Sequence, residues 1–76
     1  MIDYINLKNS YIAAIQKGIM LHGGYEGAKR VNDILHKFCE QCVDNSNYSE
    51  LEKQNMKRDL EIVKEALSQE IEHYFI

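Results

Sequence analysis

Apolar residues recur along this chain at steps of three and four, which is the spacing of one face of an α-helix, and no stretch alternates as a strand does. Proline is absent, so breaks must come from glycine or from short polar clusters. Two such breaks occur, at residues 22–24 (HGG) and 44–47 (DNSN). The pattern therefore predicts three helices, over about residues 3–21, 25–43 and 49–74.

Each predicted helix has its own apolar stripe. The first consists of Tyr4, Ile5, Tyr11, Ile12, Ile15 and Ile19. The second, with the steps of a heptad seam, consists of Ala28, Val31, Leu35, Phe38 and Cys42. The third consists of Met56, Leu60, Val63, Leu67, Ile71 and Tyr74. Leu35 and Phe38 lie in the middle of the most regular stripe, so we expect them at the centre of the core.

Local signals mark where the helices begin and end. Ser49 and Glu52 have the spacing of a capping box, which predicts the start of the third helix. Gly23 or Gly24 is expected to adopt the left-handed conformation that ends the first helix. Gly18 lies inside that helix, where glycine is unfavourable, so either the last turn frays or another backbone approaches closely, and we favour the close approach.

Three amphipathic helices with short connections predict an all-α fold, an antiparallel up-down-up bundle that forms one domain over residues 1–76. The third helix is the longest and is expected to extend beyond the other two at its C-terminal end. A chain of this size buries a small core, which favours a homodimer.

Composition narrows the classes of function. The net charge is -3, and acidic residues interrupt the basic ones on the second helix, which disfavours nucleic-acid binding. No apolar run is long enough to span a membrane and no basic leader precedes an apolar stretch, so we expect a cytoplasmic protein with reduced thiols.

The sequence His36-x-x-Cys39-x-x-Cys42 contains three residues of types that bind zinc. On a straight helix these three side chains spread over the surface, so one helix cannot surround an ion with all of them. We therefore interpret Cys42 as a core residue, Cys39 as packed beside it and His36 as a solvated residue at the margin. No metal or other cofactor is predicted.

The glycine-rich turn offers a second candidate site. Free N–H groups at the start of a helix, near two cations, could hold an anion or a nucleotide. The residues of this weak anion site are Gly23, Gly24, Lys29 and Arg30. It matches no phosphate-binding motif, and we prefer the interpretation of an ordinary interhelical turn followed by an exposed basic pair.

The third helix offers an acidic face as a third candidate. Glu61, Glu65, Glu70 and Glu72 could bind a basic groove on a protein partner. The alternative is a solvated outer face whose carboxylates pair with lysines on the same helix.

The C-terminal end is the fourth candidate, a surface for self-association. The chain ends in large apolar residues, and no Lys or Arg follows Lys64. A second copy could cover the tail, or the tail could close the end of its own bundle. The self-association surface is predicted to contain Tyr4, Tyr11, Ile71, Tyr74, Phe75 and Ile76.

No nucleophile has an evident base beside it, so we expect no enzyme. The preferred interpretation is a small helical binding protein that acts as a regulator, adaptor or inhibitor of a protein partner, of the kind that phages and other mobile elements encode. The alternative is a protein that senses or sequesters a small anion or nucleotide with the glycine-rich turn and Lys29/Arg30.

Overall fold

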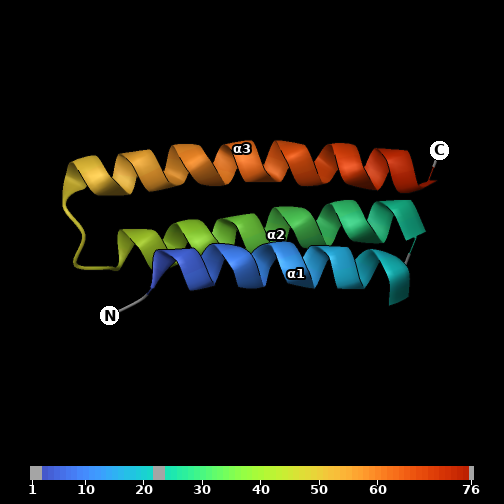
Figure 1. Ribbon diagram of the computed structural model, residues 1–76, viewed down its shortest axis with the longest axis horizontal. Coiled ribbons are helices and arrows are strands. Elements are labelled where there is room, and N and C mark those ends of the chain that lie inside the picture. Colours follow the sequence, from blue (N-terminus) through green and yellow to red (C-terminus); the bar gives the residue numbers. More distant parts are fainter. Residues whose placement is uncertain (1–2, 22–23, 76) are drawn as a thin grey trace.

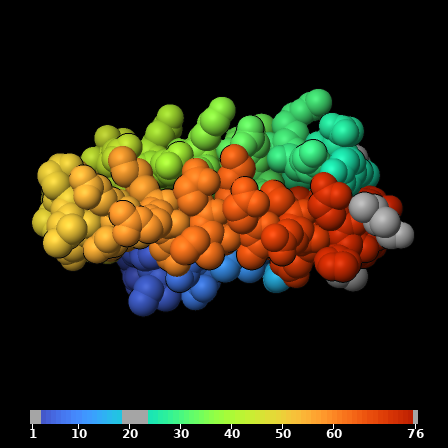
Figure 2. All heavy atoms as spheres, turned by 90° about the horizontal axis from the view of Figure 1, so that it is seen from above, coloured from blue at the N-terminus to red at the C-terminus, as the bar shows by residue number. Residues whose placement is uncertain are grey.

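The computed structural model describes residues 3–21 and 24–75. They form three α-helices, α1 (Tyr4–Leu21), α2 (Gly24–Asp44) and α3 (Glu50–Phe75), and no strand occurs within these ranges. The helices lie side by side with alternating direction (Figure 1), so the predicted all-α, up-down-up bundle is confirmed. In the orthogonal view α3 lies in front, with α2 on one side of it and α1 on the other (Figure 2).

The core runs along the line where the three helices meet. Its buried apolar members are Tyr11, Ile15, Ala28, Cys39, Val43, Leu60, Leu67 and Ile71. Leu60, Val43 and Ile71 are completely buried. The stripes predicted for the first and third helices therefore face inward in part, through Tyr11 and Ile15 and through Leu60, Leu67 and Ile71. Ile5 and Tyr74, at 63% and 58% exposed, lie outside the core, and their assignment to it is wrong.

The second helix is rotated relative to the prediction. Its buried residues are Ala28, Asn32, His36, Cys39 and Val43. After Ala28, each of them lies one residue beyond the expected position, which on a helix is a rotation of about 100°. Leu35 is half-buried against the core, whereas Phe38 is 55% exposed. The prediction that Phe38 lies at the centre of the bundle is therefore wrong.

A buried asparagine explains this rotation. The amide oxygen of Asn32 accepts a hydrogen bond from the Tyr11 hydroxyl on α1. Its amide nitrogen donates to the Lys64 carbonyl and to Ser68 Oγ on α3, at 3.2 Å each. A buried amide is tolerated when its polar atoms are paired. Asn32 is paired in this way only because α2 turns it toward both neighbouring helices.

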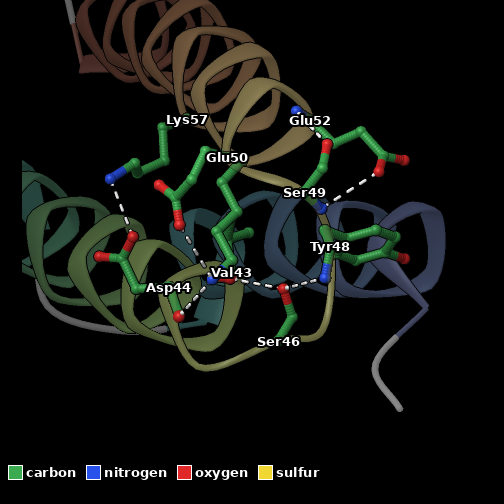
Figure 3. Close-up of polar contacts among 9 residues, drawn as sticks. Val43, Asp44, Ser46, Tyr48, Ser49, Glu50, Glu52 and Lys57 are labelled. Carbon is green, nitrogen blue, oxygen red and sulfur yellow. Dashed lines mark hydrogen bonds and ion pairs between the residues drawn. The ribbon is translucent and has the colours of Figure 1, made fainter.

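The connection between α2 and α3 is held by polar contacts (Figure 3). The Ser49 backbone N–H donates to Glu52 Oε1, and the Glu52 backbone N–H donates to Ser49 Oγ, both at 3.2 Å, so the predicted capping box is confirmed. Lys57 forms an ion pair of 2.8 Å with Asp44 at the end of α2. These contacts fix the direction in which α3 leaves the turn.

The glycines fulfil one expectation and contradict another. Gly24 has a φ of 65°, so one of the two turn glycines is left-handed as expected, while Gly23 lies outside the described residues. A Cβ atom added at Gly18 would meet nothing within 4 Å among the described neighbours. No backbone within residues 3–21 and 24–75 approaches Gly18 closely, and the prediction of a close approach is wrong there.

The extra length of α3 lies at its beginning. In Figure 1 the start of α3 projects past the end of α2, while the last turn of α3 is level with the start of α2. The Phe75 ring meets the Tyr25 ring of α2 edge to face, with centroids 6.1 Å apart. The expectation that the C-terminal end extends beyond its partners is therefore wrong.

Candidate partner-binding surface

The rotation of α2 leaves three large apolar side chains outside the core. Val31, Ile34 and Phe38 are 45%, 58% and 55% exposed, respectively. Their spacing of three and four residues places them on one face of α2. We call these three residues the α2 stripe.

Two cations lie beside the α2 stripe. Arg30 and Lys37 are exposed and flank Ile34 at helical spacing, four residues before it and three residues after it. Within residues 3–21 and 24–75, neither cation has a carboxylate at ion-pair distance. The apolar stripe therefore has a basic edge that forms no ion pair within the described ranges, although the charge of Lys37 acts on Asp33.

Two acidic residues of α2 pair with lysines of α3. Asp33 forms an ion pair of 2.8 Å with Lys64, and Asp44 forms one with Lys57. The hydrogen bond from Lys64 lowers the pKa of the Asp33 carboxyl and raises the pKa of the Lys64 ammonium. Asp33 and Asp44 are thus paired with α3, whereas Glu26 and Asp33 also line one groove with Arg30, and the charge of Lys37 acts on Asp33.

The four glutamates predicted as one acidic face lie on two flanks of α3. Glu61 approaches His36 and Glu72 accepts a hydrogen bond from Tyr25, so both lie toward α2. Glu70 instead accepts hydrogen bonds from Gln16 on α1. Glu65 is exposed. A single flat partner would not meet all four carboxylates, because the body of α3 separates them.

The predicted anion site has acidic residues beside its cations, and one of its cations, Lys29, already contacts an aromatic ring. Lys29 lies over the ring of Tyr25, 4.9 Å from its centroid. A groove of about 400 Å³ beside Lys29 and Arg30 is lined also by Glu26 and Asp33, which would repel an anion. Gly23 lies outside the described residues, and Gly24 begins α2.

The predicted self-association residues divide into buried and exposed members. Tyr11 and Ile71 are in the chain's own core, so they cannot form part of a surface, and that assignment is wrong. Tyr4 is half-buried and donates a hydrogen bond of 2.6 Å to Asp59; this bond and one from Lys8 lower the pKa of the Asp59 carboxyl.

The exposed members are at the end of α3. Tyr74 is 58% exposed and packs against Phe75, with ring centroids 5.0 Å apart. Phe75 in turn contacts Tyr25. The tail thus partly covers the end of its own bundle, and Tyr74 carries what remains of the predicted surface. Ile76 lies outside the described residues.

The histidine and the two cysteines of α2 do not converge on one point. Cys39 is buried and Cys42 is half-buried, the reverse of the expected order, and His36 is buried where a solvated position was expected. Burial, with a smaller contribution from Cys42, raises the pKa of the Cys39 thiol to about 11. Cys39 is therefore a poor nucleophile at neutral pH.

The α2 stripe could not be told from core positions by its helical spacing alone, because core residues of a helix have the same spacing. A signal was present: α2 carries a second series of Ala28, Cys39 and Val43 at helical spacing. Two polar residues, Asn32 and His36, interrupt that series. A helix with two competing apolar faces offers one of them to a partner.

Comparison with protein-family models, with curated proteins and with solved structures finds no match for this chain. Among the described helices, none combines the length and the apolar content needed to cross a membrane.

Proposed function

We propose that this protein is a non-catalytic binding module that holds an amphipathic helix of another protein against the α2 stripe. The observation that carries the proposal is the exposure of Val31, Ile34 and Phe38 on the most regularly patterned helix of the chain. Helix-in-groove recognition uses apolar anchors at this spacing. By occupying such a helix, the protein would act as a regulator, adaptor or inhibitor.

The basic edge of the α2 stripe indicates the charge that the partner helix should have. Arg30 and Lys37 form no ion pair within residues 3–21 and 24–75, so acidic residues flanking the partner's apolar face would complement them. Phe38 is the expected anchor, because aromatic side chains contribute most to binding where they become buried. Contacts at the rim are expected to affect the association rate and its dependence on salt.

The first test uses two designed helical peptides with the same apolar face, one with glutamates and one with lysines along its edges. Binding is measured by fluorescence anisotropy at low and moderate salt. We expect the acidic peptide to bind and salt to weaken it, and the basic peptide to bind at least about tenfold more weakly, a difference of about 1.4 kcal/mol. Equal binding of both peptides would contradict the proposal.

A matched pair of variants locates the surface. Phe38→Ser removes the anchor from the α2 stripe, whereas Ile62→Ser removes an apolar side chain that is 63% exposed on α3. We expect only the first to abolish binding of the acidic peptide. The same two variants, used as baits in cell extracts, should differ in the proteins retained. Loss of binding in both variants, or in neither, would exclude the α2 stripe as the docking surface.

The proposal includes a cytosolic location, supported by two cysteines that form no disulfide. It also includes a homodimer through the end of α3, supported by the exposure of Tyr74. These two surfaces are at different places on the bundle, so dimer formation and partner binding can be measured separately.

A further inference from the structure

We propose that His36, Glu40 and Glu61 form a binding site for a divalent transition-metal ion, with Zn²⁺ as the best match. Each of the three side chains can offer one ligand atom such that the three atoms lie within 4.8 Å of one another. His36 and Glu40 are four residues apart on α2, and Glu61 comes from the facing turn of α3. Helical bundles build metal sites in this way, from side chains projecting between adjacent helices.

The imidazole of His36 is the feature that points to a ligand. Its side chain is 4% exposed, and its Nε2 atom is buried without a hydrogen-bond partner among the described residues. A buried polar atom left without a partner is costly, and a native structure has few of them. A metal ion bonded to this ring would satisfy a nitrogen that accepts or donates no hydrogen bond among the described side chains and backbone.

The distances favour coordination over direct hydrogen bonding. Nδ1 of His36 lies 3.6 Å from Glu40 Oε1, and Nε2 lies 3.4 Å from Glu61 Oε1, both longer than an ordinary hydrogen bond. Two ligand atoms of a tetrahedral zinc ion, each about 2.1 Å from the metal, lie about 3.4 Å apart. The pair of His36 and Glu61 already has this separation.

Both nitrogens of the ring would have a partner in the occupied site. Only one of them can bond the ion, and the other then carries a proton that needs an acceptor. When Nε2 bonds the ion, Nδ1 carries the proton and faces Glu40 Oε1 at 3.6 Å, and Glu40 binds the ion through its other carboxylate oxygen. This mixture of imidazole and carboxylate ligands suits Zn²⁺ better than Mg²⁺ or Ca²⁺, because those two ions prefer oxygen ligands alone.

Access to the site is open on one side. The Glu61 side chain is 58% exposed and that of Glu40 is 33% exposed, so an ion can enter from solvent and a fourth position is left for water. The set differs from His36-x-x-Cys39-x-x-Cys42, since neither thiol belongs to it. It also lies on the α3 side of α2, away from the α2 stripe, so its failure would leave the proposed function intact.

The test measures zinc binding to the metal-free, reduced protein by calorimetry, using Glu61→Gln and Glu40→Gln with Glu65→Gln as the matched control. Glu65 is exposed on the same helix as Glu61 but belongs to no ligand cluster, and circular dichroism verifies that each variant stays folded. We expect one zinc ion per chain, an affinity at least about tenfold lower in the two ligand variants, and little change in the control. The affinity should also fall at acidic pH, because protons compete for the ligands.

A second measurement identifies the ligands directly. On addition of zinc, the ring nitrogen resonances of His36 should shift while those of the exposed His73 do not, and the Co²⁺ complex should lack a thiolate charge-transfer band. Absence of zinc binding to the folded protein would overturn the site. So would equal affinities for the Glu61→Gln and Glu65→Gln variants, or a Co²⁺ spectrum dominated by thiolate.

Discussion

The substitution Phe38→Ala separates the observed rotation of α2 from the one that its heptad pattern predicts. With 55% of its surface exposed, Phe38 has less than half of its area in contact with the protein. Burying a whole phenylalanine contributes about 1.5 to 3 kcal/mol, so we expect the variant to lose about 1 kcal/mol or less. If Phe38 were at the centre of the core, the same change would cost about 3 to 5 kcal/mol.

The assay is urea unfolding followed by circular dichroism, with Leu60→Ala as the reference for a true core position. Leu60 is completely buried, so its replacement should cost about 2 to 5 kcal/mol. For a chain of this size the whole free energy of unfolding is about 4 to 11 kcal/mol, and the reference variant could be largely unfolded. Ile71→Val, expected to cost about 0.5 to 1.5 kcal/mol, then serves as a milder reference at a fully buried site.

The slope of free energy against urea is about 1 kcal/mol per molar for a small protein. Phe38→Ala should therefore lower the unfolding midpoint by about 1 M or less, and clearly less than Leu60→Ala. A loss for Phe38→Ala that equals the loss for Leu60→Ala would refute the rotation. It would also remove the basis of the proposed partner surface, since Phe38 would then be inside.

Four further results are expected. Tyr11→Phe leaves the Asn32 amide oxygen without its side-chain donor and should cost about 1 to 3 kcal/mol in urea unfolding; no loss would mean that water replaces the hydroxyl. Ser49→Ala should cost about 1 kcal/mol through loss of the cap, with partner binding unchanged. The Asp59 carboxyl has a lower pKa in the folded protein than in the unfolded chain. It therefore stabilises the fold fully at pH values above its unfolded pKa of about 3.9, and this contribution is lost as the pH falls through the folded pKa. The Asp59→Asn variant should show a smaller decline in melting temperature at acidic pH. Removing residues 74–76 should convert a dimer into a folded monomer in light scattering, and a parent chain that is already monomeric at high concentration would reject the dimer.

The sequence was sufficient for the number, type and order of the helices. The polar breaks mark the helix boundaries, and the absence of proline leaves each helix continuous between them. The Ser49–Glu52 capping box acts within a few residues, so it can be recognised without knowing the rest of the fold. Such local signals are complete in the sequence itself. The same holds for the left-handed Gly24, whose conformation depends on its lack of a side chain.

The candidate surface and the metal site could not be predicted because they depend on which way α2 is turned. The apolar pattern of α2 is compatible with two rotations, and the choice between them rests on the partners that Asn32 meets on α1 and α3. The proximity of Glu61 to His36 likewise follows from the alignment of α3 along α2. Interactions between distant segments are absent from any local pattern.

The hydrogen bonds of Asn32 also restrict the alternative packings open to the chain. Three helices with apolar stripes can slide past one another by one turn, about 5.4 Å, and still bury similar apolar area. Each slipped arrangement would separate the amide from Tyr11, the Lys64 carbonyl or Ser68, leaving buried polar groups unpaired at a cost of about 1 to 3 kcal/mol each. One polar residue in the core thereby makes competing arrangements of the same helices less stable, and we expect an apolar substitution at Asn32 to yield a protein that samples more than one packing.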